Sequence, residues 1–263
     1  MTSPLIPILL YHSVNESPPA WIAPFTVTPE AFTEHLDLMV ALDCQPLAVS
    51  ALVDRLASGQ PLPARPVVIT FDDGFADTAS ISAPVLAARG FPATVYVTTA
   101  ALSGRLSTPC HRLPPAPMLS WDQLPQLERQ GIELGAHTLT HPALDILPER
   151  PAFTEIRDSK LVLEAALGHL VRSFAYPHGH HDRRVADLVR RAGFDSACAV
   201  KERLSGAADD RFALSRLTVM ASTPVARLEQ WLLGRGAPSC SPRRKLRTRA
   251  GRQYRRFLAG AGR

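Results

Sequence analysis

The segment VVITFDDGF, residues 67–75, runs from apolar and β-branched residues directly into two aspartates and a glycine. Two adjacent carboxylates repel each other, and a metal cation or a shared proton would relieve that repulsion. Successive strand residues point to opposite faces, but Gly74 permits a sharp turn that could direct both Asp72 and Asp73 into one site. The simpler alternative is that one of the two aspartates caps a helix that follows Gly74.

A second group of candidate ligands lies in HTLTH, residues 137–141. Histidines four residues apart face the same way on a helical turn and can bind one metal ion. Position 138 is threonine, so this is not the HExxH motif of zinc proteases. Pro142 disfavours a longer helix, and we expect the pair on a single turn. The alternative is two loop histidines that hydrogen-bond to the backbone.

The two motifs together predict a metal site. One aspartate and two histidines provide three protein ligands and leave a position open for water, the usual form of a catalytic zinc site. The other aspartate would then be free to act as a base on that water. A capping role does not explain two adjacent aspartates beside a separate histidine pair.

The elements that would position these residues alternate along the chain. Short apolar or β-rich runs predict seven strands, which are residues 6–11, 67–71, 93–99, 132–137, 171–176, 195–200 and 214–220. Helical patterns separate most of them, beginning with a helix that Thr28 would cap and Pro29 would start. This order favours a parallel sheet closed into a single barrel, with an open doubly wound sheet as the second choice.

The polar residues follow the ends of the predicted strands. His12, Asp72, Asp73, His137 and the turn after Tyr176 each come just past the carboxyl end of a strand. In barrels and open α/β sheets alike, that edge is where functional sites are built. We therefore expect residues from four different strands to meet in one site.

The charge of +5 is uneven along the chain. Residues 243–263 hold nine of the 29 lysines and arginines and no acids, which leaves 20 basic against 24 acidic residues elsewhere. A body of about −4 with a basic tail does not indicate a nucleic-acid-binding core. Apolar residues recur at helical spacing among the tail arginines, a pattern typical of an amphipathic helix on an anionic membrane surface. A solvated tail without structure is the alternative.

The sequence also bears on the compartment. We find no apolar run that could span a bilayer and no signal peptide in the first residues, MTSPLIPILLYHSV. The four cysteines are widely spaced and form no CxxC pair, which is typical of reduced thiols. We expect a cytoplasmic protein, with the tail as a means of peripheral attachment to the inner membrane face.

The motifs TFDDG (70–74), HTLTH (137–141) and FAYPHG (174–179) resemble, in this order, the polysaccharide deacetylases with a NodB homology domain. Flanking phrases such as LLYHSV and FPATVYV resemble the exopolysaccharide-cluster members, and the resemblance covers about residues 5–220. It implies a distorted (β/α)7 barrel and metal-dependent removal of acetyl groups from N-acetylated sugars, with zinc as the expected ion. It further implies the metal ligands Asp73, His137 and His141, Asp72 as the general base, and the backbone N–H of His178 as a donor to the oxyanion.

The sequence departs from that family in two places. The third motif often carries an arginine that orients the base, and Ala175 stands at its position. The late histidine that supplies the general acid is absent, and LSRLTV (214–219) occupies its region. His12 is the best candidate for the proton donor, with His178, His180 and His181 as weaker candidates. A hydrogen-bonded core role for His12 is the alternative.

Together these observations predict residues 1–236 as the catalytic domain and residues 237–263 as the basic tail. We expect a hydrolase that removes N-acetyl groups from a polysaccharide or its lipid-linked precursor. Two alternatives remain. One is a hydrolase of a non-sugar amide or ester on the same scaffold. The other is a degenerate barrel that binds glycan without turnover, an idea that rests on Ala175 and the absent late histidine.

Overall fold

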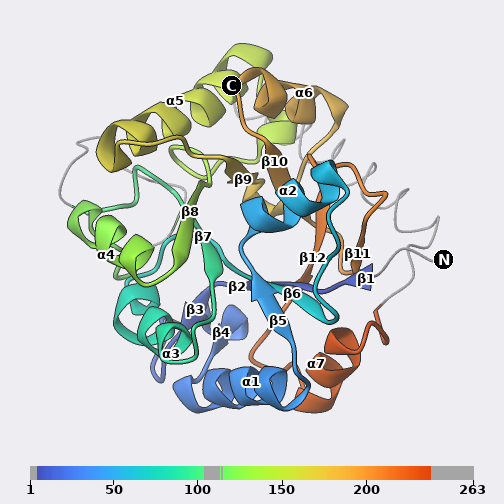
Figure 1. Cartoon of the computed structure of the whole chain (residues 1–263). Coiled ribbons are helices and arrows are strands. Elements are labelled where there is room, and N and C mark those ends of the chain that lie inside the picture. The colour runs from blue at the N-terminus through green and yellow to red at the C-terminus, as the bar shows by residue number, and fades with distance from the viewer. Residues whose placement is uncertain (1–4, 104–112, 114, 238–263) are drawn as a thin grey trace.

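The computed structural model describes residues 5–103, 113 and 115–237 of the chain (Figure 1). Seven parallel strands pair in a ring, which closes where β2 pairs with β6. Around the ring they are β2 (Ile8–Tyr11), β12 (Leu214–Thr218), β10 (Ser196–Val200), β9 (Ser173–Ala175), β8 (Ile132–Ala136), β7 (Ala93–Val97) and β6 (Pro66–Phe71). The predicted closed barrel and its seven strands are confirmed, and the open sheet is excluded.

Several short strands extend this barrel. β5 (Gln45–Leu47) pairs with the first half of β6, while β7 pairs with its second half. β1 (Leu5–Ile6) pairs with β11 (Ser205–Gly206), and β3 (Ser13–Val14) pairs with β4 (Thr26–Val27). The sequence did not predict them, because two or three residues are too few to establish a periodic pattern.

Helices surround the strands (Figure 1), and their ends follow local sequence signals. Thr28 accepts a hydrogen bond from the amide of Ala31 and so caps α1 as predicted, and Gly168 ends α5 in the left-handed region at φ 79°. The helices are α1 (Pro29–Ala41), α2 (Val49–Ser58), α3 (Ala83–Ala87), α4 (Leu124–Arg129), α5 (Glu149–Leu167), α6 (Arg183–Arg191) and α7 (Val225–Leu232). Single turns occur at Ala23–Phe25, Thr78–Ser82, Trp121–Gln123, Leu144–Ile146 and Pro177–Gly179.

Strand alternation divides the core into two layers. One apolar cluster packs between the strands and the outer helices and includes Val67, Ile69 and Phe71 of β6. The other fills the barrel interior and includes Val68 of β6 together with three residues of α2, which therefore packs against the barrel interior. The even-numbered residues of β6 thus point inward and the odd-numbered ones outward, as the two-residue period of a strand requires.

Two expectations concern the end of the chain. The predicted basic tail, residues 237–263, lies outside the described residues except for Ala237, so the division at residue 236 stays a prediction. Among the helices of the described ranges, none combines the length and the apolar character needed to cross a bilayer.

Candidate active site

The same alternation brings the candidate residues together at one mouth of the barrel. His12 comes just after β2 and lies four residues after Ile8, which faces the barrel interior, so strand alternation directs His12 to the same side. Asp72 continues the inward-facing even-numbered positions of β6 in the same way. A cavity of about 440 Å³ at this mouth is lined by His12, Asp72, Asp73, His137, His141 and His178. The three predicted metal ligands, the predicted base, the leading proton-donor candidate His12 and His178 therefore all line one cavity.

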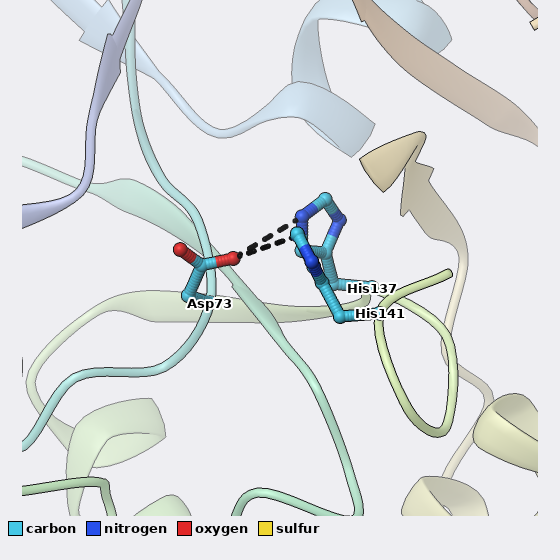
Figure 2. A group of neighbouring side chains, drawn as sticks. All are labelled: Asp73, His137 and His141. Carbon is cyan, nitrogen blue, oxygen red and sulfur yellow. Dashed lines mark ion pairs between the residues drawn. The ribbon is translucent and has the colours of Figure 1, made fainter. Parts of the chain in front are cut away.

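Among the residues that line this cavity, Asp73, His137 and His141 lie with their side chains facing one another (Figure 2). Oδ1 of Asp73 lies 3.5 Å from Nε2 of His137 and 3.1 Å from Nε2 of His141, and all three side chains are buried. Their candidate ligand atoms all lie within 4.8 Å of one another. Oδ1 of Asp73 nevertheless has no hydrogen-bond partner among the described residues. One oxygen and two nitrogens that face a common point without satisfying one another fit a bound divalent cation.

Two further observations support this fit. Nδ1 of His137 lies 2.8 Å from the carbonyl oxygen of Ala175, so Nδ1 carries the proton and leaves the Nε2 lone pair for a metal. Burial opposes ionisation of Asp73, but its contacts with His137 and His141 hold its pKa well below the ordinary value. An ionised, buried aspartate needs a nearby positive charge, and a metal ion would provide it.

The loop that carries the histidine pair is not the helical turn that we expected. Residues 137–141 form a bend in which Thr138 (φ 70°) and His141 (φ 62°) adopt left-handed backbone conformations. The Thr138 hydroxyl accepts a hydrogen bond from the amide of His141, and Glu155 of α5 accepts two from Thr140. Side-chain hydrogen bonds, not helical spacing, therefore bring the two imidazoles together.

Backbone strain is concentrated at this site. Six described non-glycine residues have positive φ, and four of them are Asp73, Thr138, His141 and His178. Each costs of order 1 kcal/mol or more and persists only where the surroundings impose it. The turn after Asp72 thus begins at Asp73 itself (φ 73°) and continues through Gly74 (φ 91°), whereas the sequence analysis assigned it to the glycine alone.

Asp72 has a partner that the sequence analysis missed. Arg216 of β12 is fully buried and donates two hydrogen bonds of 2.7 Å to the two carboxylate oxygens of Asp72. It also donates to the Thr70 hydroxyl and the carbonyl of Ala199. Burial raises the pKa of Asp72, but the charges of Arg216 and His137 and the hydrogen bonds from Arg216 act together against it and hold this pKa below the ordinary value. Asp72 is therefore an ionised carboxylate with a fixed orientation.

Arg216 also accounts for Ala175, which stands where related proteins often carry an arginine that orients the base. That residue faces the barrel interior on β9, two strands away from β12 in the ring, and a guanidinium group reaches Asp72 from β12 instead. A signal was present in the sequence. In LSRLT, Leu214 and Arg216 share one face of a buried strand, and an arginine among core positions requires a buried acidic partner.

His12 lies on the wall of the cavity. Its ring lies 5.3 Å from the ring of Phe25, and its Nδ1 has no hydrogen-bond partner among the described residues. Burial lowers the pKa of His12, although Asp73 and Asp72 raise it. The imidazole thus lies on the cavity wall, close to both carboxylates.

The HGHH turn separates its three histidines. His178 adopts φ 58° and places its ring 4.6 Å from the ring of His141, and burial lowers its pKa to about 4. Its neighbour Gly179 is tightly packed, because a Cβ there would lie 2.5 Å from Cβ of Val200. His181 stacks on Tyr176 with ring centroids 4.6 Å apart. Of the three, His178 lines the cavity, and His180 and His181 are not among its lining residues.

This architecture, a closed parallel barrel with buried carboxylates and imidazoles at its mouth, fits a metal-dependent hydrolase. Residues 59–197, more than half of the chain, match the model of a family described as polysaccharide deacetylase. The chain belongs to the polysaccharide deacetylase family.

Individual relatives agree with this assignment. YxkH of Bacillus subtilis (strain 168), which is named as a polysaccharide deacetylase, is 22% identical over 214 residues, covering 81% of this chain and 71% of YxkH. The solved structure of the Streptococcus pyogenes deacetylase PplD, in complex with acetate, has a TM-score of 0.77 and 24% identity, and the match covers 87% of this chain and 98% of PplD. The structure of IcaB from Ammonifex degensii has a TM-score of 0.74 and 23% identity, and the match covers 88% of this chain and 98% of IcaB. These two likenesses establish the fold.

Proposed function

We propose that this protein is a metal-dependent hydrolase that removes N-acetyl groups from an N-acetylated sugar in a polysaccharide or its lipid-linked precursor. The observation that carries the proposal is the pairing of two differently held carboxylates in one cavity. Asp73 lies against two imidazoles, and Asp72, its neighbour in sequence, lies against Arg216. The charge of Arg216 balances Asp72, which leaves Asp73 as the carboxylate whose buried charge a metal ion would balance.

The metal would be held by Oδ1 of Asp73 and by Nε2 of His137 and of His141. Two imidazole nitrogens and one carboxylate oxygen are a donor set typical of zinc in hydrolases, and zinc is the ion that we propose. When bound, it would polarise the acetamide carbonyl and lower the pKa of a nearby water. Residues of the chain would supply the base, the donor to the oxyanion and the proton for the leaving group.

Asp72 is the proposed general base and accepts a proton from the attacking water at a carboxylate oxygen. Arg216 fixes the direction of that carboxylate through its two hydrogen bonds and keeps it ionised. The backbone N–H of His178 is the proposed donor to the acetamide oxygen as negative charge develops there. His12, on the cavity wall, is the proposed group that delivers a proton to the departing amine nitrogen.

Arg216 also weighs against the alternative of a degenerate binding barrel. That alternative rested partly on Ala175, and a barrel freed from catalysis has no need for a buried arginine on an ionised aspartate.

Acetate release tests the function against its remaining alternatives. We expect zinc-loaded protein to release acetate from N-acetylglucosamine oligomers, and expect Asp72→Asn to release none. Acetate from esters alone would support the ester hydrolase, and no acetate from any acetylated compound would support the binder.

We further propose that the basic tail attaches the protein to an anionic membrane surface, where a lipid-linked glycan would be available. The nine lysines and arginines of residues 243–263 support this, at about 1 kcal/mol each near anionic lipid. We expect the full chain to float with anionic liposomes and a truncation before Arg243 to remain behind. Equal flotation of the two proteins would refute the attachment.

A further inference from the structure

A loop between β3 and β4 carries two aromatic residues to the rim of the active-site cavity. Trp21 and Phe25 both line the cavity together with Asp72 and Asp73. Phe25 is 37% exposed, and its ring lies 5.3 Å from that of His12 at an interplanar angle of 56°. The ring of Trp21 lies 5.9 Å from that of Phe75, the residue that follows the DDG turn. Half-exposed aromatic faces therefore stand directly beside the proposed catalytic groups.

The loop holds these rings in fixed positions. The amides of Ile22 and Ala23 both donate to the carbonyl of Pro19, and the amide of Phe25 donates to that of Ile22. The amide of Ala221 donates to the carbonyl of Pro24, which ties the loop to the segment after β12. Ile22 is buried and anchors the middle of the loop. These bonds reduce the entropy that a ligand would otherwise lose on ordering the loop.

A buried carboxylate connects the base of the loop to the catalytic segment. Asp77, four residues after Asp73, accepts hydrogen bonds from the Ser13 hydroxyl at 2.6 Å and from the amide of Val14 at 3.3 Å. Both donors belong to β3, the strand from which the loop begins. These two bonds thus tie the start of the loop to the segment that carries Asp72 and Asp73.

We propose that Phe25 and Trp21 form an aromatic wall that binds the pyranose ring bearing the acetamide, and so select an acetylated sugar over a small acetylated compound. This inference rests on the proposed function, because the wall is placed beside the proposed metal and base. A pyranose presents C–H groups on one face and hydroxyls around its edge, and a flat aromatic face contacts the C–H groups. Such contacts bury apolar area with a preferred geometry. The wall positions the ring while Asp72 takes a proton from the water that attacks the acetamide.

The kinetic test compares Phe25→Ala with Leu170→Ala, a control residue that is 73% exposed and does not line the cavity. We expect Phe25→Ala to raise KM for an N-acetylglucosamine pentamer by up to about tenfold with kcat little changed, since tenfold corresponds to about 1.4 kcal/mol, near the upper end of what aromatic contacts contribute. KM for 4-nitrophenyl acetate should stay the same, and Leu170→Ala should match the unsubstituted protein on both substrates. A lower kcat with unchanged KM would overturn the proposal, because Phe25 would then act only on His12.

A binding measurement separates this inference from the proposed function. Asp72→Asn protein is titrated with the pentamer, and tryptophan fluorescence is followed with and without Phe25→Ala. We expect a saturable signal that weakens by up to about tenfold with Phe25→Ala and disappears with Trp21→Phe. One contrary result is a pentamer that binds equally well with and without Phe25→Ala while the unsubstituted protein releases acetate. That result would overturn the aromatic wall and leave the proposed function standing. A pentamer that never binds would overturn the wall whether or not the protein cleaves acetyl esters.

Discussion

Arg216→Met is the substitution that most sharply tests how Asp72 is held. Methionine is close in length to the arginine stem and removes the guanidinium group, so the two 2.7 Å hydrogen bonds to Asp72 and the bond to Thr70 are lost. Both partners are buried, with side-chain exposures of 0% for Arg216 and 5% for Asp72. The carboxylate would remain in the barrel with its charge uncompensated.

The expected cost follows from that burial. Removing one partner of a buried ion pair destabilises a protein by about 3–5 kcal/mol, because the remaining charge stays desolvated. Replacing both partners by neutral groups costs much less, so Asp72→Asn combined with Arg216→Met should recover most of the loss. Freed from its partner, Asp72 would also lose its orientation, and we expect kcat/KM for acetate release to fall about 100-fold.

Urea unfolding measures the first effect and acetate release the second. Arg172→Met is the matched control, because Arg172 pairs with Asp54 and Asp195 at the surface, where its side chain is 39% exposed. Exposed pairs contribute about 0–1 kcal/mol, and this variant should keep its activity. If Arg216→Met lost less than about 1 kcal/mol, or if the double variant were no more stable than the single one, the ion pair would not have the role assigned to it.

Two further predictions concern histidines. His12→Gln should lower kcat on an N-acetylated sugar about 100-fold. Cleavage of 4-nitrophenyl acetate, whose leaving group needs no proton, should continue at nearly the normal rate. An equal loss of kcat on both substrates would exclude His12 as the proton donor. Burial lowers the pKa of His35 to about 4, so the unfolded chain binds more protons and stability is lost as pH falls from about 6.5 to about 4. Between about pH 7.5 and about pH 5 this amounts to about 2 kcal/mol in urea unfolding, and His35→Gln should remove that dependence. An unchanged pH dependence in this variant would contradict the assignment.

The barrel could be predicted from the sequence because its strands are short apolar runs that end in polar residues. The runs at 67–71 and 132–137, for example, correspond to β6 and β8 almost residue for residue. Their carboxyl ends meet at one mouth in any closed parallel barrel, which is why His12, Asp72 and His137 could be grouped from the sequence alone.

What could not be predicted depends on contacts between distant segments. Arg216 lies 144 residues after Asp72, and only the closure of the ring brings β12 near β6, through β2. The bend at residues 137–141 depends on Glu155, which reaches Thr140 from α5. Helical spacing suggested a turn there, and tertiary hydrogen bonds produced a different backbone with the same pair of imidazoles. The aromatic loop has no periodic pattern at all, because prolines and backbone bonds shape it.

The most direct test of the account is to measure zinc binding and acetate release on the same samples of unsubstituted protein, Asp73→Asn and Asp72→Asn. The account predicts one ion per chain in the unsubstituted protein and in Asp72→Asn, and little in Asp73→Asn, since Asp73 lies between His137 and His141. Only the unsubstituted protein should release acetate from N-acetylglucosamine oligomers. Full zinc binding by Asp73→Asn, or undiminished acetate release by Asp72→Asn, would contradict the division of roles between the two aspartates.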